Sequence, residues 1–252
     1  MKILVAAKHV IDHNIQVRVR SDGSGVHTEN IKMGLNPFDE VAIEAAIRLK
    51  EQNIASEIIA LSIGGDEALN SLRPSLALGA DRAILVKHSS AIEPLYTAEI
   101  FKQIALKENI SLVFLGRQSI DNESNQVGQM LSYKLGWGLA NSASEINISS
   151  NTNSAEITQE MDDGTQKIKI TMPCVITCDL RLNEPRFPSM MNIMQAKRKQ
   201  IEQLNIEMFN INLDSTFETI NIEEPKNRAD NKVQILDNVD ALISILKSKD
   251  II

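Results

Sequence analysis

The sequence predicts an α/β protein: a doubly wound, mostly parallel sheet with an antiparallel meander and an extended C-terminal arm. Three observations support this fold class. Short β-branched runs alternate with stretches of helical periodicity as far as residue 135, strand-like runs then follow one another without helices, and the last fifty residues carry few apolar patterns. Strands separated by helices indicate right-handed parallel crossovers, whereas strands without intervening helices indicate antiparallel pairing.

The first part of the chain supplies the parallel sheet. A buried strand is expected at Ile3–Ala7 and a helix at Pro37–Lys50, with Asn36 placed to cap that helix. Between them, Ile15–Arg20 alternates with period two and runs into a Gly-rich turn sequence, which predicts a hairpin. Further strands are expected at Glu57–Ser62, Ala83–Val86 and Leu112–Leu115, and further helices at Asp66–Leu78, Leu95–Glu108 and Glu123–Leu135.

The second part supplies the meander and the arm. Its predicted strands are Ile146–Ile148, Ala155–Met161, Gln166–Thr171 and Val175–Thr177. Leu180–Met194 holds two prolines and three methionines without periodicity, so it is expected to be an exposed irregular segment. We therefore predict an α/β domain over residues 1–204 and an arm over 205–252, with a short helix at Val239–Leu246.

Composition excludes several classes of protein. The 252 residues carry 26 basic and 33 acidic side chains and a net charge of −7, so nucleic acid and anionic membranes are not expected partners. Cys174 and Cys178 lie four apart in an apolar run and are expected to be buried thiols of a reduced compartment rather than a redox pair. The N-terminus has no signal-peptide core, and no run of about 18 apolar residues occurs. A soluble intracellular protein is expected.

Four segments are predicted to reach the carboxyl ends of the parallel strands, where open α/β sheets bind ligands: Ala6–Lys8, Asn36–Asp39, Ser62–Gly65 and Gly116–Gln129. The last is unusually polar. Its amide side chains suit an adenine edge, and free backbone N–H groups at a helix start suit a phosphate. The alternative is a solvated loop in which Asp121 caps the next helix, and the acidic residues there would weaken a phosphate site.

Motifs of catalysis and metal binding are absent. The sequence has no Gly-rich dinucleotide fingerprint, no phosphate-binding P-loop and no nucleophile elbow. His9 and His13 are four apart, but Asp12–Asn14 reads as a loop, so a zinc site is not expected. No catalytic residue is assigned. The methionines near residue 190 either fill the core or form an adaptable docking surface, and the flanking prolines favour the surface.

Five segments in order give the chain a resemblance to a known family. They are Val5–Lys8, Asn36–Glu40, Leu78–Arg82, Gly116–Gln118 with Asn125–Met130, and Asp179–Arg186. With this order and spacing, the chain resembles the beta subunit of electron transfer flavoprotein over essentially its whole length.

The resemblance implies a carrier subunit without turnover of its own. It would pair with an alpha subunit that holds most of an FAD, and the pair would pass electrons from acyl-CoA and related dehydrogenases to a membrane quinone oxidoreductase. The chain itself would bury a structural AMP. By position, the expected contacts are Ala6, Asn36, Pro37, Phe38, Asp39, Ile63, Asp121, Asn122, Glu123, Ser124, Asn125, Gln126, Val127, Gly128, Gln129, Met130, Leu131 and Ser132.

The resemblance also assigns residues 183–200 to a loop that recognises dehydrogenases. Met190 stands where other members have an anchoring leucine, and His13 stands where others carry a tyrosine close to the flavin. Expected partner contacts are Arg186, Phe187, Ser189, Met190, Met191, Ile193 and Met194. The compartment would be the bacterial cytoplasm or, in a eukaryote, the mitochondrial matrix.

Two other readings remain open. One is a stand-alone adenine-nucleotide sensor or hydrolase, which the polar strand-end segments would also suit. The other is a bifurcating flavoprotein subunit with a second FAD in place of AMP. Asn125 and Gln126 favour the AMP-holding branch of the family.

Overall fold

The computed structural model describes residues 1–149, 153–225 and 235–252. The chain divides into two compact units. The first comprises Met1–Gln16 and Thr28–Glu218, and the second comprises Val17–His27 and Thr219–Ile252. The first unit holds the sheet and the candidate site.

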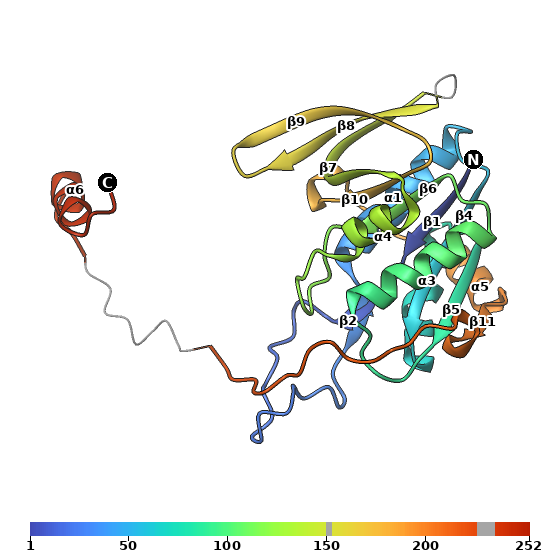
Figure 1. Ribbon diagram of the computed structural model, residues 1–252, viewed down its shortest axis with the longest axis horizontal. Helices are drawn as coiled ribbons and strands as arrows, with labels where there is room; N and C mark the ends of the chain where they lie inside the picture. The colour runs from blue at the N-terminus through green and yellow to red at the C-terminus, as the bar shows by residue number, and fades with distance from the viewer. Residues whose placement is uncertain (150–152, 226–234) are drawn as a thin grey trace. The chain divides into compact units, whose positions relative to one another are not determined.

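Nine strands form one sheet within the described residues, in the order β11-β5-β4-β1-β6-β10-β7-β8-β9 (Figure 1). Neighbours from β11 to β7 are parallel, and β7, β8 and β9 are antiparallel. The bounds are β1 (Lys2–Ala6), β4 (Glu57–Gly64), β5 (Arg82–Lys87), β6 (Leu112–Gly116), β7 (Gly138–Ile148), β8 (Ser154–Met161), β9 (Gly164–Thr171), β10 (Cys174–Cys178) and β11 (Glu202–Asn205).

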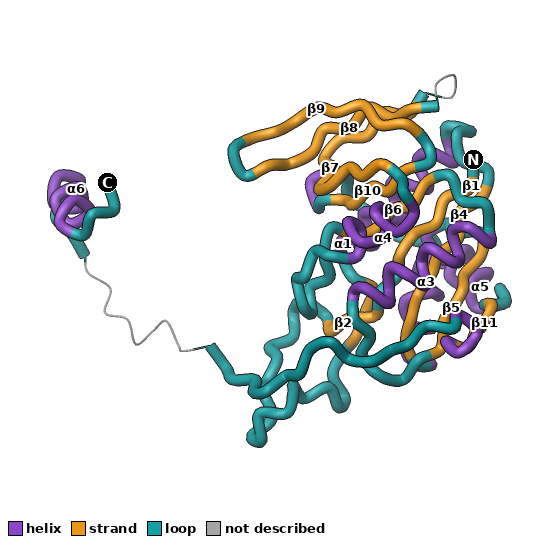
Figure 2. Tube along the Cα trace, in the orientation of Figure 1, coloured by secondary structure: helices purple, strands orange, loops and turns teal. Residues whose placement is uncertain are grey.

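Helices cover both faces of the sheet. On one face pack α1 (Pro37–Glu51), α2 (Leu69–Leu78) and α5 (Met190–Arg198), and on the other α3 (Pro94–Lys107) and α4 (Val127–Leu135) (Figure 2). Strand β1 contributes Ile3 and Val5 to the first core layer and Leu4 and Ala6 to the second, as alternation along a strand requires. The chain winds outward from β1 in both directions, so the doubly wound fold is confirmed, with the switch point between β1 and β6.

Strand β10 corrects the predicted meander. It lies between β6 and β7 and is parallel to both, whereas the sequence placed it last in an antiparallel series. All five of its residues are buried, and such a continuous apolar run is typical of an inner parallel strand. Cys174 and Cys178 are free and buried there, as predicted, and burial raises the pKa of Cys174 to about 12.

Two helix predictions are also corrected. Helix α4 begins at Val127 instead of 123, because Glu123 and Asn125 adopt φ values of +50° and +47°, which no right-handed helix contains. The segment predicted to be irregular up to Met194 instead ends in helix α5, which Ser189 caps by accepting the Asn192 N–H at 3.2 Å.

The hairpin predicted at Ile15–Arg20 is reduced to a single bridge between Val19 and Val26 in the second unit. The side chain of Val17 is exposed there, so the alternating pattern has no core face to bury. A short two-stranded sheet, β2 (His9–Ile11) with β3 (Met33–Leu35), was not predicted. The remaining elements are the 3₁₀ turns η1 (Asp66–Ala68), η2 (Leu180–Leu182) and η3 (Ile206–Phe209), and helix α6 (Val239–Ser248).

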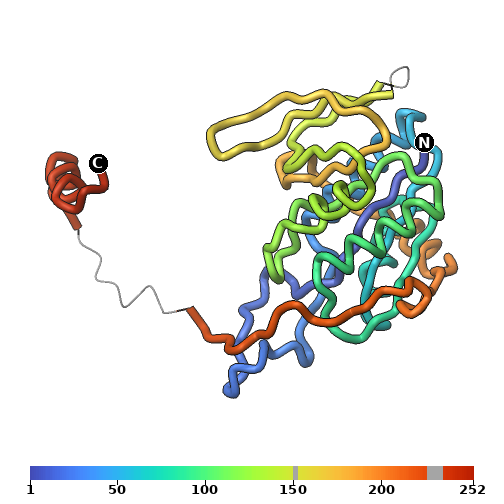
Figure 3. Tube along the Cα trace, viewed as in Figure 1, coloured from blue at the N-terminus to red at the C-terminus, as the bar shows by residue number. Residues whose placement is uncertain are grey.

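The predicted arm is divided between the units. Residues 206–218 run along α3 of the first unit (Figure 3), where Gln103 donates to the Phe209 carbonyl at 3.1 Å and Glu93 accepts the Thr216 N–H at 2.7 Å. The remainder belongs to the second unit and includes α6, which is present where the sequence predicted a helix. That the arm packs on another chain stays a prediction. None of the described helices is long and apolar enough to span a bilayer.

Candidate functional site

A cavity of about 450 Å³ opens at the carboxyl ends of the central strands. Ala6 of β1, Ser62 of β4 and Gly116 of β6 line its sheet side, and Thr97 and Phe101 of α3 line another. The cavity therefore lies at the switch point of the doubly wound sheet, where this fold class binds ligands. Its volume is in the range of small-molecule pockets.

Asp39 ties the two central strand ends together beside the cavity. One carboxylate oxygen accepts the Lys8 N–H at 2.9 Å, just after β1, and the other accepts the Gly116 N–H at 2.9 Å, at the end of β6. Asp39 is 3% exposed. Burial raises the pKa of this carboxyl, and the two N–H donors oppose the shift. The side chain thus fixes the spacing of β1 and β6 at the switch point.

Asn36 holds the loop after β6 instead of capping α1 through its side chain. It occupies the N-cap position, but its amide donates to the Gln118 carbonyl at 2.9 Å and accepts the Ile120 N–H at 3.3 Å. Asn36 is 1% exposed, so these bonds satisfy polar groups removed from water. Asn36 is thus the N-cap residue, as predicted, while both ends of its side-chain amide hold the loop.

Lys8 neutralises the acidic residue that appeared unfavourable for a phosphate. Its ammonium lies 2.7 Å from Asp121 and donates to the Ser119 hydroxyl at 3.0 Å. Burial raises the pKa of Asp121, but the charge and hydrogen bond of Lys8 outweigh burial and leave that pKa below its ordinary value. Asp121 lies well before the start of α4, so it is not the cap of that helix.

The loop before α4 is held by its own amide side chains and by close packing. Asn125 accepts a hydrogen bond from Gln129 at 3.1 Å. A Cβ on Gly128 would lie 2.3 Å from the Thr177 methyl of β10, and a Cβ on Gly116 would lie 2.6 Å from the Phe38 Cβ. Glycine at these two positions therefore lets the first turn of α4 and the end of β6 approach their neighbours.

Most residues predicted to contact the nucleotide line this one cavity. They are Ala6, Asn36, Asp39, Ile63, Asp121, Asn122, Ser124, Asn125, Gln126, Val127 and Gly128. Other predicted residues fall outside its lining: Pro37, Phe38, Glu123, Gln129, Met130, Leu131 and Ser132. Leu131, for example, is fully buried in the core beside α3. Contact of each residue with a nucleotide stays a prediction.

Sequence reasoning missed one wall of the cavity. Ser90, Ala91 and Ile92 line it from the segment between β5 and α3, and Pro94 lines it from the start of α3. Their position after a predicted parallel strand was the available signal, because that strand end lies at the same edge of the sheet. The segment has no distinctive motif, so it was not singled out.

The cavity fits an adenine mononucleotide in size and in chemistry. It offers amide groups from Asn125 and Gln126, and the ammonium of Lys8, which is paired with Asp121. Two lining residues also have buried polar atoms without a protein partner in the described part of the chain, namely the Ser62 hydroxyl oxygen and Arg117 Nε. Buried polar groups of this kind are ordinarily satisfied by water or a ligand.

The histidines have separate partners. His9 Nδ1 lies 2.7 Å from the Ser71 hydroxyl, and His13 Nδ1 lies 3.9 Å from an Asp12 carboxylate oxygen. Over residues 1–149, 153–225 and 235–252, no group of three or more His, Cys, Asp or Glu side chains could hold a metal ion.

A second feature lies away from the cavity, on helix α5 and the residues before it. Phe187 is 97% exposed and Met190 75%, and Met191 and Met194 are also exposed. Ser189, which caps the helix, is exposed as well, whereas Arg186 and Ile193 are half-buried, so most of the predicted partner-binding set is exposed.

Arg186 fastens the segment before α5 to helix α1. Its guanidinium donates to Glu44 at 2.8 Å and to Glu51 at 3.0 Å. Burial raises the pKa of Glu44, but the bonds from Arg186 and Arg48 outweigh it and lower that pKa below its ordinary value. The segment that carries the exposed apolar side chains is therefore attached to α1 by ion pairs.

The chain is similar to electron transfer flavoprotein beta subunits of bacteria, plants and animals. A family model described as electron transfer flavoprotein domain matches residues 24–207. Electron transfer flavoprotein subunit beta of Bradyrhizobium diazoefficiens is 44% identical over 250 residues, covering 99% of this chain and 98% of the relative. The mitochondrial subunit beta of Arabidopsis thaliana is 43% identical over 249 residues, with 99% and 98% coverage. The human subunit beta is 38% identical over 232 residues, or 90% of each chain.

Proposed function

The chain belongs to the family of electron transfer flavoprotein beta subunits, and we propose that it is one half of a two-chain carrier holding one AMP and one FAD. The family's role is electron transfer by a flavoprotein. In the proposed carrier, electrons pass from acyl-CoA and related dehydrogenases of fatty acid β-oxidation to a quinone oxidoreductase, and the chain has no turnover of its own.

The observation that carries the proposal is the cavity at the switch point. Its size and the amides of Asn125 and Gln126 suit an adenylate. AMP in this cavity would join β1, β4, β6 and the loop before α4, so its role would be to stabilise the fold.

An alpha subunit would supply most of the FAD site. The flavin carries the redox chemistry, and the protein supplies orientation and electrostatics. The family resemblance places His13 close to the flavin, and the side chain of His13 is exposed in this chain. Helix α5 would dock the dehydrogenases through Met190 and its neighbours, whose flexible thioethers adapt to different partner surfaces.

The test is to purify the chain with its companion from the native host and to count the nucleotides released by acid. One AMP and one FAD for each pair of chains is the expected result. Two FAD and no AMP would instead identify the bifurcating branch. A colourless pair that supports no dehydrogenase-linked dye reduction would overturn the proposed carrier role.

Asn125→Ala provides a sharper test of the cavity. It removes the acceptor of the Gln129 side chain and one amide of the cavity wall. We expect lower AMP content at unchanged FAD content. Full AMP occupancy in this variant would contradict the assignment of the loop.

The stand-alone alternative, an adenine-nucleotide sensor or hydrolase, rests on the same cavity. Such a protein would bind or hydrolyse ATP without a companion chain. It would have no use for the exposed apolar face of α5.

The proposed compartment is the bacterial cytoplasm or the mitochondrial matrix, because relatives of both origins are named.

A further inference from the structure

Helix α5 is held at its C-terminal end by an arginine from another helix. Arg73 of α2 donates through one guanidinium nitrogen to the Ala196 carbonyl at 2.6 Å and to the Lys199 carbonyl. Carbonyls in the last turn of a helix lack partners within the helix. A cation at this end also interacts favourably with the helix dipole. Arg73 therefore satisfies both needs of the α5 terminus.

The anchor adds to the packing of α5 on α2. Helix α5 is nine residues long, and a helix of that length is marginally stable by itself. Among its described residues only Ala196 is classed as buried, at 2% exposed, while three methionines face outward. Little of α5 is buried, so polar bonds help to hold its C-terminal end: those of Arg73 and that of the Lys199 ammonium, which donates to the Ala80 carbonyl at 2.9 Å.

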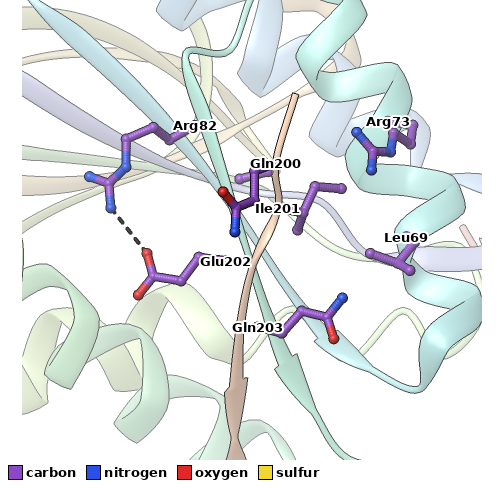
Figure 4. Close-up of a pocket in the computed structure, with 8 residues that line it drawn as sticks. Leu69, Arg73, Arg82, Gln200, Ile201, Glu202 and Gln203 are labelled. Atoms are coloured by element: carbon purple, nitrogen blue, oxygen red, sulfur yellow. Dashed lines mark hydrogen bonds and ion pairs between the residues drawn. The ribbon is translucent and has the colours of Figure 1, made fainter. Parts of the chain in front are cut away.

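A hollow of about 740 Å³ lies beside Arg73 (Figure 4), and an arginine in such a place can serve to bind an anion. Residues Gln200–Gln203 line it, and Arg82 lies at its other side. Arg82 is bound to Glu202 at 3.1 Å and to Glu108 at 2.8 Å, and Arg73 is bound to carbonyls. Arg82 is therefore neutralised by its carboxylate partners, and Arg73 has a structural role in the two carbonyl bonds whether or not the hollow takes a ligand.

We propose that Arg73 is a positioning residue for partner docking. It fixes the C-terminal turn of α5 so that Met190, Met191 and Met194 form one rigid apolar face before a partner arrives. Rigidity of this kind lowers the conformational entropy lost on binding. The inference rests on the proposed docking role of α5 and adds to it the residue on α2 that makes the face rigid.

The experiment compares Arg73→Ala with the unaltered two-chain protein, using an acyl-CoA dehydrogenase reduced by its own substrate as electron donor. We expect the KM for the flavoprotein to rise about five- to tenfold, with kcat within about twofold, because the docked complex and its flavin geometry are unchanged. Arg73→Lys retains the charge but not the guanidinium fork, so it should recover part of the loss.

Hydrogen exchange gives a second readout that does not depend on turnover. Amides of residues 190–199 should exchange faster in Arg73→Ala, while those of β1 keep their protection. If Arg73→Ala does not assemble, Arg73→Lys carries the same comparison. Unchanged exchange over 190–199 together with an unchanged KM would overturn the proposal.

Two control variants separate the possible outcomes. Arg82→Ala removes an arginine with several carboxylate partners that does not touch α5, so it should lower stability and leave the KM unchanged. Met190→Ala tests the docking face itself and should raise the KM. An unchanged KM for Met190→Ala would defeat the docking role. A raised KM for Met190→Ala, with no change for Arg73→Ala or equal changes for Arg73→Ala and Arg82→Ala, would defeat only the positioning role.

Discussion

At the scale of single residues, Asp39 is the buried carboxylate that links the two central strand ends of the candidate site. Both of its carboxylate oxygens accept backbone N–H groups, one from each central strand end. The sequence placed Asp39 near the site through the order of segments. It gave no indication of these two bonds, because they depend on the register of β1 and β6, which no local pattern encodes.

Asp39→Asn is expected to destabilise the protein. The amide has one acceptor oxygen, so its NH₂ group must face either the Lys8 N–H or the Gly116 N–H, and one buried donor loses its partner. The expected loss is about 1–3 kcal/mol in the free energy of unfolding, measured by urea denaturation of the purified two-chain protein.

Glu40→Gln is the matched control, since it makes the same chemical change in the same helical turn. Glu40 is only half-buried, and the change there should be within about 0.5 kcal/mol. Equal effects of the two substitutions would show that the double acceptor role of Asp39 is unimportant.

At the scale of elements, the difference between prediction and structure follows from what each element packs against. Helices α1, α2 and α3 were predicted to within a few residues, because their apolar stripes repeat with helical spacing. Helix α5 was missed because it is only nine residues long and follows a segment with two prolines, which favoured an irregular loop. Strand β10 was found, but its place between β6 and β7 was not, since pairing order is a property of the whole sheet.

The junction of α4 with β10 gives a prediction at this scale. Gly128→Ala places a methyl group 2.3 Å from the Thr177 methyl, so helix or strand must shift. We expect a loss of about 1–3 kcal/mol in the free energy of unfolding, with lower nucleotide content, because the start of α4 lines the cavity.

A second substitution tests the cause. Thr177→Ser removes the methyl but keeps the hydroxyl, which accepts the Ser142 N–H at 2.9 Å. The double variant Gly128→Ala with Thr177→Ser should therefore be more stable than Gly128→Ala alone. If the second change brings no recovery, the close approach to Thr177 is not the reason for glycine at 128.

At the scale of the whole molecule, the chain combines a unit that carries its own core with a second unit whose described residues form no core cluster. The two core clusters lie in the first unit, and no residue of α6 in the second is classed as buried. Yet α6 is amphipathic, with Val239 and Leu242 exposed. A helix with an uncovered apolar side is expected where another chain completes the fold.

Removing residues 236–252 should therefore leave the first unit intact and weaken the proposed pairing. The free energy of unfolding of the chain alone, measured by thermal denaturation, is expected to change by no more than about 0.5 kcal/mol. The reason is that no buried apolar area is lost from the core. In contrast, co-purification with the flavin-holding companion should fall severalfold, measured as FAD bound for each truncated chain.

The double variant Leu242→Ser with Leu246→Ser keeps the chain length and should reproduce the loss of FAD. Full flavin content in the truncated protein would place the pairing surface elsewhere, whereas early unfolding of the truncated chain would show that α6 stabilises its own fold.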